Sequence, residues 1–226
     1  ALEVAMDVLA EKTGVDPVEL RIRNIPDCNP EEDLPFSSHK LAECLQQGAE
    51  KFGWDSGPRE PRQTRDGEWW VGTGMASAAR VHNVGEARAR VTLRPDGTAE
   101  VRTDMTDIGT GTYTIVAQMV GEMLGLGVDD VLVQLGDTDF PRGSGSGGSW
   151  GGASIGSAVY LACRALREKL AKKAGTEESD LALRNGAVEG GKSLADLLDG
   201  QELSEEGHYE PGEIADTHTA SGFGAF

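Results

Sequence analysis

Residues 143–170 read GSGSGGSWGGASIGSAVYLACRALREKL, a glycine- and serine-rich run that continues directly into a mixed apolar and charged pattern. By composition alone, residues 143–159 would pass for a flexible linker. Two features are not typical of a linker: Trp150 stands inside the run, and apolar residues at helical spacing follow it, among them Val159, Leu166 and Leu170. The stretch therefore predicts an ordered turn that leads into a long helix over residues 153–175.

The segments before this helix predict a sheet. Residues 86–93 (EARARVTL) and 98–105 (TAEVRTDM) alternate apolar and polar positions, and the turn RPDG between them favours a hairpin. A helical stripe follows over residues 112–125, and then a short apolar strand over residues 129–137. The order β-β-α-β-α predicts an α+β fold, a two-layer sandwich with the helices on one face of the sheet.

Beyond the long helix the periodic pattern weakens. Asn185-Gly186 predicts a second hairpin within residues 181–191, and a short helix is expected over residues 193–200. Residues 201–226 are sparse in apolar side chains. We expect them to form a surface loop that leads back to the sheet.

A helical segment precedes the sandwich. Helices are predicted over residues 1–13 and 39–54, and between them the sequence DPVELRIRN starts a short helix with Asp16 as cap and Pro17 at the first helical position. Residues 55–66, rich in proline, glycine and charge, read as a linker. The predicted organisation is a helical segment at 1–54, a linker at 55–66 and an α+β domain at 67–226, which begins with an interrupted strand.

The composition excludes some classes of function. The formal net charge of −17 opposes binding to nucleic acid and to anionic membrane surfaces. No apolar run approaches the roughly 20 residues of a membrane span. The three cysteines are widely spaced and the four histidines are scattered, so we predict no metal ligands among them. The chain opens within a helical pattern and closes on strand-like residues, so we expect a piece of a longer polypeptide.

Two glycine-rich turns have the same design. Residues 107–114 (DIGTGTYT) and 143–156 each place glycines and then small hydroxyl residues at the start of a predicted helix. Unpaired amides and the positive end of the helix dipole favour an anion there, and the absent Cβ atoms let a ligand approach the main chain. Tight turns without a ligand are the alternative. Neither turn has the pattern of a Rossmann or P-loop site, so the anion would be held in another manner.

Five blocks of sequence, in order, resemble the molybdenum-binding subunit of the xanthine dehydrogenase/aldehyde oxidase family. The resemblance is strongest to bacterial aldehyde oxidoreductases that use a molybdopterin cytosine dinucleotide. It spans about residues 1–170 and weakens beyond them. The blocks are LEVAMDVLAEKTGVDPVELRIRN at 2–24, PFSSHKLAECLQQGAEKFGW at 35–54, DIGTGTYT at 107–114, VQLGDTDFP at 133–141 and GSGGSWGGASIGSA at 145–158.

The resemblance implies that the chain binds a molybdopterin cytosine dinucleotide carrying molybdenum. It implies that the first turn contacts the pterin and its phosphates, and that the second lines another side of the cofactor with Ala153 close to the metal end. Many relatives have glutamine where this chain has Thr110, which puts one side-chain contact in doubt. The implied cofactor-binding residues are Gly109, Thr110, Gly111, Thr112, Gly151, Gly152, Ala153, Ser154, Ile155 and Gly156.

The resemblance also implies a reaction, the hydroxylation of a small aldehyde or heteroaromatic substrate with water as the oxygen source. Electrons would leave through iron–sulfur clusters and FAD on partner subunits or domains. The glutamate that acts as base belongs to a Gly-Glu-Leu/Val-Gly block expected beyond Phe226, and Glu213 in PGEIA lacks the surroundings of that block. We therefore predict no catalytic residue in this chain and no activity for it alone. A cytoplasmic location is expected, with the periplasm as the alternative.

Two other functions are compatible with the sequence. A stand-alone module could bind another phosphate-bearing ligand through the same glycine-rich turns. A domain with a purely structural or assembly role could leave both turns empty.

Overall fold

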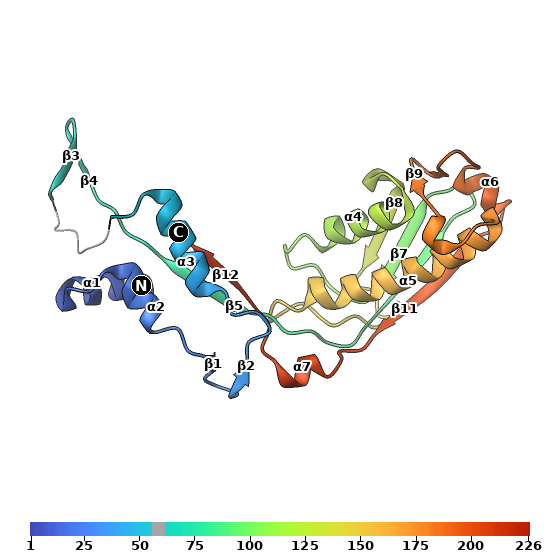
Figure 1. Cartoon of the computed structure of the whole chain (residues 1–226). Coiled ribbons are helices and arrows are strands. Elements are labelled where there is room, and N and C mark those ends of the chain that lie inside the picture. Colours follow the sequence, from blue (N-terminus) through green and yellow to red (C-terminus); the bar gives the residue numbers. More distant parts are fainter. Residues whose placement is uncertain (56–61) are drawn as a thin grey trace. The chain divides into compact units, whose positions relative to one another are not determined.

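The computed structural model describes residues 1–55 and 62–226, which form two compact units (Figure 1). The central unit comprises residues 83–213, and the terminal unit joins residues 1–82 to residues 214–226. No helix among the described residues is long and apolar enough to cross a membrane. Residues 56–61 of the predicted linker lie outside the described residues, and the division into 1–54, 55–66 and 67–226 stays a prediction.

The central unit contains a four-stranded sheet with the strand order β11-β6-β7-β8 (Figure 1). β6 and β7 form the predicted antiparallel hairpin, in which Leu93 pairs with Ala99. β8 adds parallel to β7, and β11 adds antiparallel to β6. The strands are β6 (Ala87–Leu93), β7 (Ala99–Thr103), β8 (Val131–Leu135) and β11 (Leu203–Tyr209).

Two helices, α4 (Thr112–Leu124) and α5 (Gly151–Ala174), pack on the sheet and on each other. Alternate residues of β6, such as Ala89 and Val91, are fully buried, whereas Arg90 between them is exposed. One face of the sheet therefore meets the helices and the other meets solvent. The predicted β-β-α-β-α core and α+β class are confirmed, with α5 beginning at Gly151 rather than at residue 153.

The prediction of a loop was wrong for residues 203–209, which form β11. Gly207 pairs with Ala89 at the centre of the strand and is buried. A Cβ atom on Gly207 would lie 1.9 Å from the carbonyl oxygen of Ala158 and 2.7 Å from the amide of Ala162, both in α5. Because the helix backbone occupies the space of a side chain, the strand lacks the alternating apolar pattern that would have revealed it.

The remaining elements of the central unit are short. Asn185 and Gly186 have φ angles of 51° and 70°, which is the left-handed pair that a two-residue hairpin requires, and the predicted second hairpin is confirmed. Ser193 caps the predicted short helix by accepting a hydrogen bond from the amide of Asp196. The elements are η1 (Val128–Asp130), η2 (Glu178–Asp180), β9 (Leu183–Arg184), β10 (Ala187–Val188) and α6 (Leu194–Leu198).

The terminal unit contains the three predicted N-terminal helices and several short strands. The segment predicted as one interrupted strand forms two strands with different partners, because β4 pairs with β3 whereas β5 pairs with β12. The helices are α1 (Leu2–Thr13), α2 (Pro17–Arg23), α3 (Leu41–Phe52) and α7 (Ile214–Thr217). The strands are β1 (Cys28–Asn29), β2 (Leu34–Pro35), β3 (Thr64–Asp66), β4 (Trp69–Val71), β5 (Ser77–Val81) and β12 (Ser221–Ala225).

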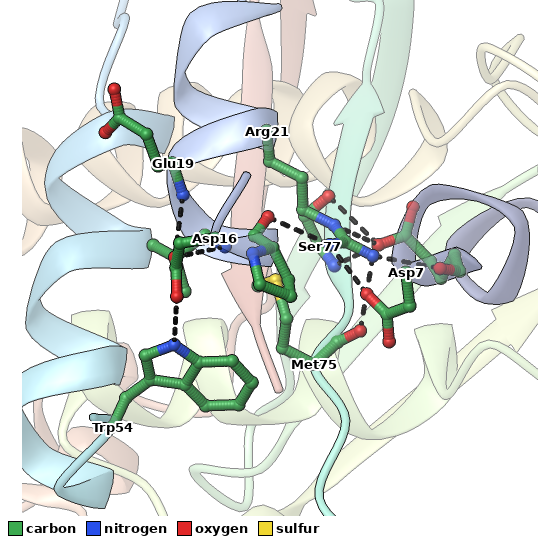
Figure 2. Close-up of polar contacts among 10 residues, drawn as sticks. Asp7, Asp16, Glu19, Arg21, Trp54, Met75 and Ser77 are labelled. Carbon is green, nitrogen blue, oxygen red and sulfur yellow. Dashed lines mark hydrogen bonds and ion pairs between the residues drawn. The ribbon is translucent and has the colours of Figure 1, made fainter. Parts of the chain in front are cut away.

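Arg21 of α2 connects α1 to the start of β5. Its guanidinium is almost fully buried and lies 3.0 Å from a carboxylate oxygen of Glu3 and 2.9 Å from one of Asp7 (Figure 2). It also donates to the carbonyl oxygen of Met75, and the same Glu3 oxygen accepts the amide of Ser77 at 2.6 Å. One buried cation thus holds together three segments that are far apart in the sequence.

Asp16 is the predicted cap of α2 and also links that helix to the end of α3. One of its carboxylate oxygens accepts the amides of Val18 and Glu19, at 2.9 and 3.0 Å. The other accepts the indole Nε1–H of Trp54 at 2.9 Å (Figure 2). A local capping residue therefore also makes a tertiary contact.

We expect Arg21→Met to destabilise the terminal unit by about 3 kcal/mol, because two partly buried carboxylates lose their cation. Hydrogen exchange of the α1 and α2 amides measures this loss as a lower opening free energy. Arg23→Met is the matched control: Arg23 pairs with Glu19 on the exposed surface, where such a pair contributes less than about 0.5 kcal/mol. Equal losses of stability in Arg21→Met and Arg23→Met would contradict the role given to the buried Arg21.

The same network predicts a loss of stability in acid. Burial raises the pKa of the Glu3 carboxyl, but the Ser77 amide and the Arg21 guanidinium lower it more, so the pKa lies below its ordinary value. The resulting stabilisation is present above the ordinary glutamate pKa and is lost as the pH falls through the folded-state value. Protection of α1 should fall in that window, and Glu3→Gln should remove that part of the pH dependence. An unchanged acid profile in Glu3→Gln would count against this link.

We expect Gly207→Ala to destabilise the central unit by about 3 kcal/mol, at the upper end for an overpacked core, because the new methyl group would meet helix backbone. Gly212→Ala is the control, since no atom lies within 4 Å of a Cβ there, and it should change stability by less than about 0.5 kcal/mol. Urea unfolding followed by circular dichroism compares the two variants. A stable Gly207→Ala chain would show that β11 can move away from α5.

Candidate functional site

The second glycine-rich turn leads into the first turn of α5. Trp150 is the residue that precedes the helix, and its side chain does not cap the amides of this end. Ser154 accepts the amide of Gly85 at 2.9 Å and donates to the carbonyl oxygen of Trp150 at 2.7 Å. The start of α5 is therefore fastened to the segment before β6, while its amides receive no cap from the residue that precedes the helix.

The predicted residues of α5 divide into two groups by exposure. Ser154 and Ile155 are fully buried, Ser154 in the hydrogen bonds just described and Ile155 in the apolar core. Gly152 and Ala153 are exposed. Gly156 is buried, but it lines the same part of the surface as Gly152 and Ala153.

That surface is an open hollow of about 490 Å³ beside the N-terminal half of α5. α5 supplies a row of small residues at helical spacing, so the helix backbone lies close to the floor of the hollow. Met119 of α4 and Tyr209 at the end of β11 bound it. The lining residues are Met119, Gly152, Ala153, Gly156, Ser157, Tyr160, Leu161 and Tyr209.

The surroundings of the three glycines at the start of α5 differ from one glycine to the next. A Cβ on Gly151 would lie 2.3 Å from Cε of Met105, and one on Gly156 would lie 3.0 Å from Sδ of Met119, so a side chain at either position would displace the end of a methionine. A Cβ on Gly152 would meet no atom within 4 Å from the rest of the described residues, apart from its chain neighbours and the adjacent helix backbone, and the residue does not have a left-handed φ angle. Neither backbone conformation nor internal packing requires glycine at 152.

Two polar atoms of the turn lack partners within the described residues. The Nε1–H of Trp150 and the hydroxyl of Ser144 are buried without a hydrogen bond there. Both residues lie close to Gly85, beside the start of α5. Buried polar atoms of this kind usually have a partner, such as another chain segment, a water or a ligand.

The first glycine-rich turn contains its own anion. Gly109 and Gly111 have φ angles of 95° and 81°, so the turn itself requires glycine. One carboxylate oxygen of Asp107 accepts the amides of Gly109 and Thr110, both at 2.8 Å, and the other lies 3.5 Å from the amide of Tyr113 in α4. The expected anion site at this helix N-terminus thus has an aspartate at its centre.

The titration of Asp107 agrees with this geometry. Burial raises the pKa of the carboxyl, but the hydrogen bonds from the amides of Gly109, Thr110 and their neighbours lower it more, so the pKa lies below the ordinary aspartate value. The side chain is therefore an anion at neutral pH.

The two turns lie side by side. The hydroxyls of Thr106 and Ser146 are 3.2 Å apart, and Asp104 accepts the amide of Gly143. Thr112 is buried at the start of α4, and the hydroxyl of Thr110 lies 3.3 Å from that of Thr112. The structure therefore brings the two sets of predicted residues to neighbouring loops of one unit.

Among the described residues, one group of side chains could hold a metal ion. His208 Nε2 lies 2.8 Å from a carboxylate oxygen of Glu86 and 3.5 Å from one of Glu210, all exposed. The guanidinium of Arg88 lies 3.5 Å from the same His208 nitrogen and 3.7 Å from Glu86. This arrangement is an ion-pair cluster with its own cation.

Comparison with known proteins identifies the family. A family model described as "Molybdopterin cofactor-binding domain" matches residues 47–226. The chain belongs to this family. The resemblance inferred from the sequence blocks is thereby confirmed, and the family binds the cofactor class that those blocks implied.

Two relatives and one solved structure illustrate the match. The chain is 45% identical over 227 residues to the aldehyde oxidoreductase molybdenum-binding subunit PaoC of Escherichia coli O157:H7, covering 99% of this chain and 31% of that protein. It is 31% identical to the putative xanthine dehydrogenase molybdenum-binding subunit XdhA of Escherichia coli strain K12, covering 93% of this chain and 30% of the relative. The chain thus spans about a third of these relatives.

The solved structure supports the fold. Quinoline 2-oxidoreductase from Pseudomonas putida 86 superposes on the whole chain with a TM-score of 0.69, at 23% identity and over 33% of its own length. At that identity the similarity concerns the fold alone, and it agrees with the α+β arrangement.

Sequence reasoning missed several residues around the hollow. The helical stripe predicted over residues 112–125 includes Met119 but does not place it beside α5. No pattern marks Tyr160 or Tyr209 as its neighbours, because the three residues come from different elements. Asp107 did carry a signal: an aspartate two residues before a glycine commonly accepts the amides that follow it.

Proposed function

We propose that this chain binds a molybdopterin cytosine dinucleotide along the first two turns of α5, as part of a molybdenum hydroxylase large subunit. Gly152 is the observation on which the proposal rests. It is an exposed glycine in the first turn of a long helix, and neither its φ angle nor its neighbours require it. Alanine is the better helix former, so close approach of a ligand would account for glycine at this exposed position.

The residues present fit such a cofactor. The open N-terminus of α5 offers amides and a positive dipole end to phosphate oxygens, and Gly152, Ala153 and Gly156 let a planar group approach the helix backbone. When bound, the cofactor would supply molybdenum redox chemistry. This chain would bind and orient it. Gly109, Thr110, Gly111 and Thr112 would form a second wall.

The parent enzyme, in this proposal, oxidises small aldehydes with water as the oxygen source. The higher identity to a subunit named aldehyde oxidoreductase than to one named xanthine dehydrogenase favours aldehydes over heteroaromatic substrates. Iron–sulfur clusters and FAD on partner subunits or domains would accept the electrons, and the base would come from outside this chain. We propose a cytoplasmic or periplasmic location. The family match makes the stand-alone module for another phosphate ligand the less favoured alternative.

Gly152→Ala separates cofactor binding from folding. We expect the variant to fold as stably as the parent or better, because alanine is the better helix former, and to retain roughly tenfold less molybdenum and pterin, because the methyl group would occupy the cofactor's position. Gly152→Leu should lose more. Molybdenum is measured by mass spectrometry and pterin by its fluorescence after oxidation, on protein purified from its own host.

Gly212→Ala is the matched control for these measurements. It is another exposed glycine of the same unit with open space at the Cβ position, and it lies outside the hollow. Its molybdenum and pterin content should equal that of the unchanged protein. Full cofactor content in Gly152→Leu would show that the cofactor does not use the proposed surface.

A further inference from the structure

The turn before α4 contains an acidic residue of its own, Asp107, and the turn before α5 does not. Asp107 places one carboxylate oxygen 2.8 Å from the amides of both Gly109 and Thr110, while its second oxygen faces the amide of Tyr113 at 3.5 Å. The residue in the same position before α5 is Trp150, whose side chain caps none of the helix amides. The two turns look alike in sequence, yet the first contains its own aspartate directly before a helix, whereas the carboxylate that accepts the Gly143 amide in the second comes from Asp104, outside the turn.

We propose that Asp107 is a positioning residue that closes the amides of the first turn to phosphate and holds that turn in its cofactor-ready shape. This inference rests on the proposed function only in its second part, the link to the cofactor. Its first part, the exclusion of phosphate, concerns the chain alone.

The physical argument follows from the hydrogen bonds. A phosphate at the amides of Gly109 and Thr110 would have to displace a carboxylate that already accepts both, and any phosphate placed beside the carboxylate would be repelled by it. The phosphates of the dinucleotide would therefore bind elsewhere, with the uncapped end of α5 as the open position. The first turn would meet the cofactor through the hydroxyl of Thr110 and the surface of its two glycines, which have no atom within 4 Å of a Cβ.

The first test uses inorganic phosphate and the NMR signals of the Gly109 and Thr110 amides in the 226-residue chain. In the unchanged chain, phosphate should leave both signals in place. In Asp107→Ala the amides lose their acceptor, and both signals should shift with added phosphate. In Asp107→Asn the amide oxygen can still accept both hydrogen bonds, so the signals should again be insensitive. Phosphate-dependent shifts of these amides in the unchanged chain would overturn the proposal.

A matched control removes another aspartate of the same kind. Asp96 accepts the amide of Thr98 at 2.9 Å in the turn between β6 and β7, away from any helix start. Asp96→Ala should not make Gly109 and Thr110 sensitive to phosphate. If it did, a general loosening of the chain would explain the result and the specific role of Asp107 would be refuted.

The second test measures molybdenum and pterin in protein from its own host. Loss of a capping carboxylate commonly shifts a local equilibrium by roughly a factor of ten, so Asp107→Ala should retain about a tenth of the cofactor and Asp107→Asn most of it. Full retention by Asp107→Ala would refute the positioning role. If the unchanged protein contained no cofactor, the proposed function would fail, whereas the phosphate experiment would still decide whether Asp107 closes the turn.

Discussion

The contact between Gly207 and the backbone of α5 sets the geometry of the central unit. β11 lies beside the helix only because residue 207 has no side chain, since a Cβ there would overlap the carbonyl oxygen of Ala158. The neighbouring positions follow the same rule, because Ala89 on β6 and Ala162 on α5 are small and fully buried. A helix held at backbone distance from a sheet has little freedom to roll or slide. The face that α5 turns toward the hollow is therefore fixed by a packing contact at Ala158 and Ala162, which lie on the same stretch of the helix as the lining residues Ser157 and Tyr160.

This constraint explains why the hollow is lined by rigid elements. Its small residues come from α5, and its borders come from α4 and the end of β11. Specific hydrogen bonds hold the glycine-rich loops in place, such as that of Ser154 in α5 to the amide of Gly85 and that of Asp107 to the amide of Tyr113 in α4. A site built on helices and strands keeps its shape more closely than a site built on loops. The loops add amides and hydroxyl groups to a surface that already exists.

The sequence predicted the helices and strands whose buried face is made of apolar residues at regular spacing. β6, β7, α4 and α5 each present an apolar face, and each was expected where it lies. β11 has no such spacing of apolar residues, because its buried residue is Gly207 and its other residues are mostly polar. The site was predicted only as two separate turns. Their adjacency, and the presence of Tyr209 beside α5, depend on how the sheet and helices pack, which no local pattern encodes. Asp107 belonged to the quoted motif DIGTGTYT, but only the structure showed that it accepts the amides of Gly109 and Thr110.

The number of glycines in a turn therefore says little about function until the structural reason for glycine at each position is known. Gly109 and Gly111 are needed for their left-handed backbone, and a side chain at Gly151 would displace the tip of the Met105 side chain. These requirements would exist in a protein that binds nothing. Gly152 is different, because the fold neither demands nor benefits from it, and alanine would favour the helix. A residue that costs stability without an internal reason points to a requirement from outside the chain. The chain belongs to a cofactor-binding family, and the surface proposed for the cofactor includes residue 152.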